Sequence, residues 1–188
     1  NDVTRSTLLE NRLTGLRHYR SRLGDLVRAL SITERAMPVP DNFRNALERE
    51  LAASGDGDEI ATRNPGEVFR QYLACMVRRV DVMIAAAERG QFSPDPAGYA
   101  SADALVADLK LIEDALISAG SVSIATRLVR PVRREVESFR FSTVRLDVRE
   151  NTTKLNAALA DLRGQADGPG TRAAGGGGPG DGRTGSRT

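Results

Sequence analysis

One short stretch near the end of this 188-residue chain has a different apolar period from the sequence before it. In FSTVRLDV, three aliphatic residues alternate with three polar ones: Val144, Leu146 and Val148 against Thr143, Arg145 and Asp147. A period of two predicts a β-strand, here over residues 142–148. A strand must pair its backbone groups with neighbouring strands. No second strand is predicted, so we expect the partner strands to come from outside this chain.

The remaining sequence up to residue 162 has the apolar spacing of amphipathic helices. The predicted helices cover residues 4–30, 41–53, 66–89, 102–119, 123–138 and 151–162. Pro38 and Pro40 separate the first two, because proline cannot continue a helix. The sequence SGDGDE, residues 54–59, is predicted to be a loop. We therefore expect a mainly α fold, with one domain over residues 1–162.

Three helix features are predicted from local chemistry. Asn64 is expected to cap the 66–89 helix, with Pro65 at its start and Glu67 completing a capping box. Ser101 is the expected cap of the 102–119 helix. Pro131 lies within the 123–138 segment and predicts a kink or a restart, because it removes a backbone donor and clashes one turn back.

The C-terminal tail, residues 163–188, contains ten glycines and almost no large apolar residue. Such a segment buries too little surface to offset its ordering entropy, so we predict disorder. Its four arginines and two aspartates give a net charge of +2, which equals the net charge of the whole chain. Residues 1–162 are therefore neutral. The sequence pI of about 9.0 thus does not indicate a nucleic-acid-binding fold, and the tail has no aromatic residue for base stacking.

The inventory of reactive side chains is small. His18 is the only histidine and lies among arginines, which favours a surface or packing role. Cys75 is the only cysteine and falls on the apolar face of its helix, which predicts a buried, unreactive thiol and fits a reducing cytoplasm. One His and one Cys exclude a Cys/His metal site. No apolar run approaches the roughly 20 residues that span a bilayer, so no membrane segment is expected.

Arg149 directly follows the predicted strand. In parallel β/α barrels, residues at this end of a strand point into the active site. A guanidinium can hold a carboxylate or a phosphate through two parallel hydrogen bonds. The spacing alone leaves two readings open, a ligand-binding arginine and an exposed loop arginine.

Four separated segments resemble the phosphoenolpyruvate carboxylase family, in the family's order. NDVTRSTLLENRLTGLRHYRSRLGDLVRALSITER resembles the long helix that follows the family's GGDRDGNP motif, and NPGEVFRQYLACMVRRV resembles its EPYR-type helix. YASADALVADLKLIEDAL is similar to a YSSPEEFLADLRLIYDSL-like helix, and FSTVRLDVRENTTKLNAAL to the LDIRQES-like segment. The resemblance covers roughly residues 1–162.

The resemblance implies a fragment of a larger enzyme: the helical portion of an α/β barrel, with 142–148 as a single barrel strand. The family converts phosphoenolpyruvate and bicarbonate to oxaloacetate and phosphate, which feeds the tricarboxylic acid cycle. It uses Mg²⁺ or Mn²⁺ and usually forms a homotetramer, and we expect it in the cytoplasm. By resemblance Arg149 matches the substrate-binding arginine of the DIRQ pattern. Arg145 receives no role, and Glu150 stands where the family commonly has Gln.

The resemblance also implies that much of the catalytic machinery is missing. The family's His-Pro-Thr motif, its glycine-arginine phosphate loop and its metal-binding acids do not occur in this sequence. We therefore assign no catalytic residue and no metal ligand, and expect the chain alone to be inactive and to bind no metal. The alternative reading is a free-standing helical interaction module without catalysis, which would pair or cover its strand internally.

Overall fold

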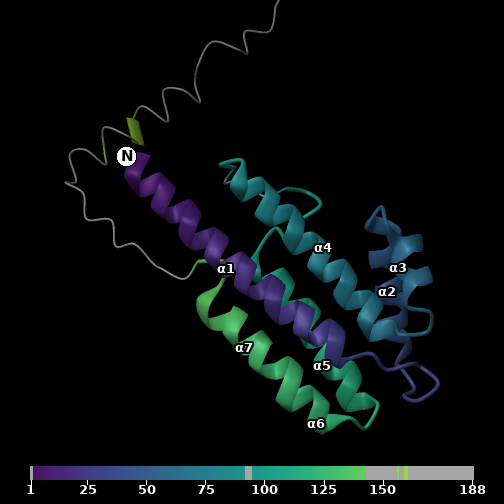
Figure 1. The fold of residues 1–188 in the computed structure, drawn as a ribbon. Coiled ribbons are helices and arrows are strands. Elements are labelled where there is room, and N and C mark those ends of the chain that lie inside the picture. The colour runs from purple at the N-terminus through teal and green to yellow at the C-terminus, as the bar shows by residue number, and fades with distance from the viewer. Residues whose placement is uncertain (1, 92–94, 143–155, 157–158, 161–188) are drawn as a thin grey trace, which may run out of the picture. The chain divides into compact units, whose positions relative to one another are not determined.

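The computed structural model describes residues 2–91, 95–142, 156, 159 and 160, in two units, Asn1–Arg145 and Leu146–Thr188. The first unit is built from helices (Figure 1). They are α1 (Asp2–Ala29), α2 (Asp41–Ala53), α3 (Gly57–Arg63), α4 (Val68–Glu88), α5 (Ala102–Ser118), α6 (Val122–Ile124), a π-helical turn η1 (Ala125–Val129) and α7 (Arg130–Phe139). In the second unit, the described residues Asn156, Leu159 and Ala160 are helical. No strand occurs in the described residues, which confirms a mainly α chain.

Several predictions fall outside the described residues. They are the strand at 142–148 beyond Ser142, Arg149, the 151–162 helix apart from its three described positions, and the tail at 163–188. The barrel context of the strand therefore stays an inference from the family resemblance.

Helices α1 and α4 pack lengthwise and antiparallel (Figure 1). Arg17 Nη2 donates to Glu88 Oε1 at 2.8 Å, and Arg20 Nε donates to Asp81 Oδ1 at 2.9 Å. The later residue of α1 meets the earlier residue of α4, which sets the antiparallel direction. These pairs are about half exposed, so they specify the register more than they stabilise the fold.

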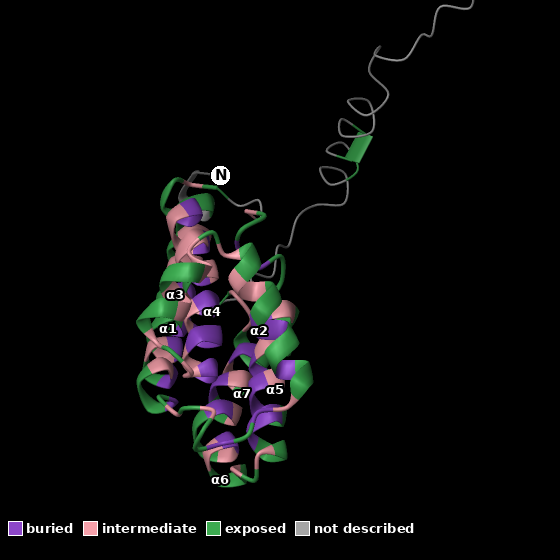
Figure 2. Cartoon of the chain, turned by 90° about the vertical axis from the view of Figure 1, so that its right-hand side faces the viewer, coloured by how far each residue is buried: buried purple, intermediate pink, exposed green. Residues whose placement is uncertain are grey.

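The core of the first unit lies between the helices, whose buried sides face inward (Figure 2). Along α1 and just after it, the buried residues recur every three or four positions: Leu16, Tyr19, Leu23, Leu26 and Leu30. This spacing keeps them on one face of a helix. The Phe43 ring of α2 lies 4.8 Å from that of Phe69 and 5.1 Å from that of Tyr72, centroid to centroid, which fixes α2 against α4.

The start of α4 differs from the predicted capping box. The helix begins at Val68, and no side chain caps its first turn. Gly66 has a φ of +75°, so the chain turns before the helix can start. The Glu67 carboxylate accepts hydrogen bonds from Ser31 Oγ at 2.8 Å and Arg70 Nη1 at 3.1 Å instead. The predicted capping box is therefore wrong, because a tertiary contact takes its acceptor.

Helix α3 replaces the second half of the predicted 54–59 loop. Its first turn carries Asp58 and Glu59 and its last turn carries Arg63, which suits the helix dipole. A Cβ on Gly57 would lie 2.1 Å from the carbonyl oxygen of Leu51. The glycine that suggested a loop is therefore needed for close packing of α3 on the end of α2.

Helices α5 and α7 form a second antiparallel pair (Figure 1). The Ser101 hydroxyl accepts the amide of Ala104, which confirms the predicted cap of α5. Before Pro131 the chain widens into the π-helical turn η1, and Pro131 occupies the first turn of α7. The predicted restart occurs, and the wider turn removes the need for the hydrogen bond that a proline cannot donate.

Candidate functional site

Two of the three reactive side chains singled out from the sequence lie among the described residues. The His18 side chain is half exposed, and its Nε2 contacts the Glu135 carboxylate of α7. Cys75 is 1% exposed, and burial raises the pKa of its thiol to about 11. The prediction that this thiol is buried is confirmed, and its raised pKa supports the expectation that it is unreactive. Arg149, the only residue assigned to a site, lies outside the described residues.

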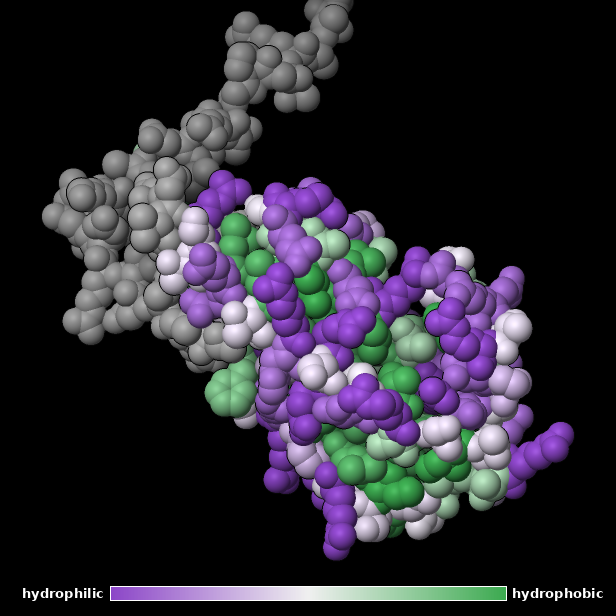
Figure 3. All heavy atoms as spheres, viewed as in Figure 1, coloured by the Kyte–Doolittle hydropathy of each residue, from purple (hydrophilic) through white to green (hydrophobic). Residues whose placement is uncertain are grey.

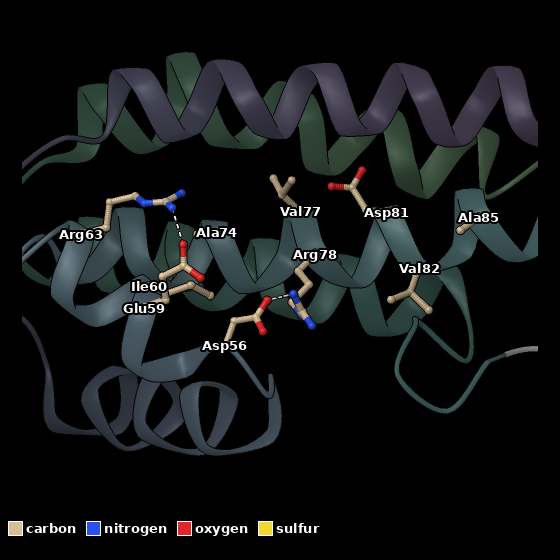
Figure 4. Close-up of a pocket in the computed structure, with 10 residues that line it drawn as sticks. All are labelled: Asp56, Glu59, Ile60, Arg63, Ala74, Val77, Arg78, Asp81, Val82 and Ala85. Carbon is tan, nitrogen blue, oxygen red and sulfur yellow. Dashed lines mark hydrogen bonds and ion pairs between the residues drawn. The ribbon is translucent and has the colours of Figure 1, made fainter.

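A pocket of about 460 Å³ lies between α3 and α4. Figure 4 shows Val77, Val82 and Ala85 along α4 and Ile60 on α3, and all four residues line the pocket. Apolar groups therefore line much of the pocket, and charged groups flank them.

The charged side chains of this pocket all have oppositely charged partners. Asp56 contacts Arg78, and Glu59 contacts Arg63 (Figure 4). Asp81 accepts from Arg20 of α1 at 2.9 Å. A phosphate or carboxylate ligand would have to displace a carboxylate from a guanidinium to bind here. The pocket is therefore better suited to an apolar side chain than to an anionic substrate.

The densest polar cluster of the described residues centres on Asp108 of α5. Its Oδ1 accepts from the Tyr72 hydroxyl at 2.9 Å, and its Oδ2 accepts from the Tyr99 hydroxyl at 2.8 Å and from Arg79 Nη1 at 3.2 Å. The Arg79 guanidinium lies 3.9 Å from the centre of the Tyr99 ring and pairs with Glu50 of α2 at 3.4 Å. The cluster joins α2, α4, α5 and the loop before α5.

The phenols of this cluster are held in their protonated form. Burial, followed by the charge of Asp108, raises the pKa of Tyr72 and of Tyr99 well above the ordinary value. Each hydroxyl therefore acts as a permanent donor to the Asp108 carboxylate at any physiological pH. With its donors fixed and buried, the cluster supports the fold and offers no group for proton transfer.

Sequence reasoning missed this cluster, although a signal was present. Tyr99 and Asp108 both fall in YASADALVADLKLIEDAL, at positions that agree with the family-like sequence YSSPEEFLADLRLIYDSL. An aspartate on a helix whose other face is apolar reads as a solvated residue unless its partners are known. Tyr72, one of those partners, is 36 residues away in the sequence.

A second buried carboxylate joins α5 to α7. Glu113 is 4% exposed, and its two oxygens accept from Arg130 Nε at 2.6 Å and from Arg133 Nε at 2.8 Å. Burial alone would raise the pKa of Glu113, but the hydrogen bonds from the two arginines outweigh burial and lower it. Arg130 and Arg133 therefore pair with an internal carboxylate rather than with a ligand.

Hydrophobic residues reach the surface where α5 meets α6 (Figure 3), and Ile117, Val122 and Leu128 are exposed on these elements and on η1. Within the described ranges, no group of three His, Cys, Asp or Glu side chains could hold a metal ion. None of the helices described is long and apolar enough to cross a membrane.

The comparisons with known proteins agree with one another. The family model for phosphoenolpyruvate carboxylase matches residues 1–171. A phosphoenolpyruvate carboxylase of Methylorubrum extorquens is 52% identical over 160 residues, which is 85% of this chain and 17% of that protein. Phosphoenolpyruvate carboxylases of Azorhizobium caulinodans and a Thermus species are 32% and 31% identical, over 90% and 77% of this chain.

The chain spans less than a fifth of the length of these relatives: 17%, 18% and 14%. The match nevertheless extends from the first residue through all the described helices and beyond them. This chain belongs to the phosphoenolpyruvate carboxylase family.

Proposed function

We propose that this chain is a segment of an enzyme that converts phosphoenolpyruvate and bicarbonate to oxaloacetate and phosphate. The observation that carries the proposal is the family match over residues 1–171, together with 52% identity to a curated phosphoenolpyruvate carboxylase. The reaction transfers the phosphoryl group to bicarbonate, giving carboxyphosphate and an enolate, and the enolate then attacks the released CO₂. Both substrates are anions, so the active site needs fixed positive charge.

Within that enzyme we assign Arg149 to substrate binding. A guanidinium holds a carboxylate or phosphate through two charge-assisted hydrogen bonds, and its charge persists at every pH of interest. The helices α1 to α7 would form part of the rigid support around the barrel, with 142–148 as one barrel strand. Glu150 follows Arg149 directly and adds a negative charge beside this anion-binding residue, at a position where the family commonly has Gln.

Three further properties belong to the same proposal. The family uses a divalent cation, Mg²⁺ or Mn²⁺. We place the ligands of this cation elsewhere in the whole enzyme and assign none of them in this chain. The whole enzyme would form a homotetramer and act in the cytoplasm.

The role of Arg149 is tested in the whole parent enzyme, with Arg145 as a matched control. Arg149→Ala should lower kcat/KM for phosphoenolpyruvate by about 100-fold or more, because an anion loses a two-point guanidinium contact. Arg145→Ala removes the same charge four residues earlier and should change kcat/KM by less than about three-fold, as expected away from the site. An unchanged kcat/KM in Arg149→Ala would refute the substrate role.

A further inference from the structure

The chain leaves α7 through a residue with an unusual backbone. Arg140 has φ 56° and ψ −144°, and it is the one non-glycine residue with positive φ among those described. The Ser142 amide donates to the Phe139 carbonyl at 3.3 Å and closes a four-residue turn. These angles are close to those of the first central residue of a type II′ turn, a position where glycine dominates. Arg140 therefore holds a conformation that its side chain disfavours.

Other helix ends in this chain have glycine at a position of positive φ. Gly55, Gly90 and Gly120 follow α2, α4 and α5, and their φ values are 70°, 75° and 77°. At the end of α7 an arginine stands in place of the residue that would adopt positive φ without strain. Contacts with the rest of the fold must therefore stabilise this backbone conformation, and the Arg140 side chain makes such a contact.

The Arg140 side chain makes a two-point contact with the first turn of α5. Its Nη1 donates to Asp103 Oδ1 and its Nη2 donates to Asp103 Oδ2. The hydrogen bonds from Arg140 lower the pKa of the Asp103 carboxyl, which keeps the pair charged. Parallel contacts of this kind fix direction as well as distance.

Stability alone does not explain the pair. The Asp103 side chain is 72% exposed, and exposed ion pairs stabilise folded proteins little. Helix α7 is already fastened to α5 by the buried Glu113, which pairs with Arg130 and Arg133. The Asp103–Arg140 pair acts at a different place, directly after the last residue of α7.

We infer that the Asp103–Arg140 pair is a positioning latch, which holds the strained turn at the exit from α7, upstream in the sequence of the substrate-binding Arg149. Arg140 lies nine positions before Arg149 in the sequence. The inference rests on the proposed role of Arg149. Arg140 itself is a positioning residue and touches no substrate.

Glycine separates the two functions of Arg140 in an experiment on the whole parent enzyme. Arg140→Gly relaxes the backbone but removes the contact with Asp103, whereas Arg140→Ala keeps the strain and removes the contact. Arg140→Gly should be at least as stable to heat as Arg140→Ala, yet lose about ten-fold in kcat/KM for phosphoenolpyruvate, since small misplacements of a substrate-holding group are costly. The substitution should raise KM for phosphoenolpyruvate and leave KM for bicarbonate unchanged. A general structural defect would affect both KM values.

Two further variants complete the test. Asp103→Asn should lower kcat/KM for phosphoenolpyruvate as much as Arg140→Gly does. The double variant should lower it no further than either single variant, because both substitutions break the same Asp103–Arg140 contact. Asp114→Asn, which breaks the exposed Lys110–Asp114 pair on the same helix, should leave kcat/KM unchanged. If Arg149→Ala impairs the enzyme but Arg140→Gly keeps the wild-type kcat/KM, the latch is refuted and the substrate role of Arg149 stands. If Arg149→Ala has no effect, the substrate role fails, and the latch fails with it.

Discussion

Asp108 accepts hydrogen bonds from three donors that belong to two other parts of the fold. Tyr72 and Arg79 come from α4, and Tyr99 comes from the loop before α5. The carboxylate is mostly buried, with 17% of its side chain exposed. Removing it would leave two mostly buried phenols without an acceptor and the Arg79 guanidinium with Glu50 as its remaining partner, which costs more than the loss of the hydrogen bonds themselves.

We expect Asp108→Ala to lower the free energy of unfolding of the chain by about 3 kcal/mol, the range for breaking a mostly buried charged network. Asp114→Ala on the same helix is the control. It breaks a pair with Lys110 in which both side chains are more than half exposed, and should cost less than about 0.5 kcal/mol. Urea unfolding followed by circular dichroism measures both. Equal losses would show that the Asp108 cluster is not a special support.

Cys75 makes the stability of the chain depend on pH in the alkaline range. Burial raises the pKa of its thiol from 9.0 to about 11. A raised pKa means that the folded state favours the neutral thiol. The stabilisation is therefore complete below pH 9 and is lost as the pH rises through 11.

We expect the free energy of unfolding of the wild-type chain to fall by about 2 kcal/mol more than that of Cys75→Ala between pH 8 and 11.5, because each pH unit between the two pKa values of the thiol contributes at most about 1.4 kcal/mol. The comparison with Cys75→Ala removes the contribution of the tyrosines, whose pKa values are also raised and which are common to both proteins. Unfolding free energies measured across that pH range provide the test. Parallel pH profiles of the two proteins would contradict the prediction.

Residue roles that depend on neighbours in the sequence could be predicted, and those that depend on distant neighbours could not. Ser101 caps α5 because its acceptor and donor are three residues apart, and Cys75 is buried because its helix has one apolar face. Glu67 also has the spacing of a cap, yet Ser31, 36 positions earlier, engages its carboxylate. Sequence spacing carries no information on that competition.

Helix α3 shows why glycine is ambiguous at the scale of elements. In SGDGDE the two glycines suggest a loop, and Gly55 does adopt a positive φ of 70°. Gly57 has a different purpose, since it begins α3 and lets the helix approach the backbone of Leu51. The sequence shows the same residue type in both positions, and only the packing of α3 on α2 separates the two uses.

The same substitution at two glycines should therefore have opposite effects. Gly57→Ala places a Cβ 2.1 Å from the Leu51 carbonyl oxygen, and should destabilise the chain by about 2 kcal/mol, as overpacking does. Gly24→Ala lies inside α1, where the nearest group is Arg28 Nη1 at 3.8 Å. It should stabilise the chain by about 0.5–1 kcal/mol through helix propensity. Thermal unfolding distinguishes the two signs, and a stabilised Gly57→Ala would contradict the packing argument.

For the whole molecule, the helices and the predicted strand have different requirements. The described helices bury their apolar faces against one another, in the antiparallel pairs α1–α4 and α5–α7. The mainly α composition could therefore be predicted from periodicity alone. A strand at 142–148 would need partner strands, and the matched relatives are more than five times as long as the part that this chain covers. Helical packing is a local property of this chain, whereas the proposed barrel would be a property of the whole enzyme.

That difference predicts how the chain behaves alone. Forming oxaloacetate needs sites for phosphoenolpyruvate, bicarbonate and a divalent cation at once. The family's His-Pro-Thr motif and its glycine-arginine phosphate loop do not occur in this sequence. We expect the purified chain with Mg²⁺, phosphoenolpyruvate and bicarbonate to give no oxaloacetate above the protein-free rate in a malate-dehydrogenase-coupled assay. The parent enzyme, assayed in the same mixture, is the positive control. Turnover that scales with the concentration of the chain would mean that residues within it can complete the active site.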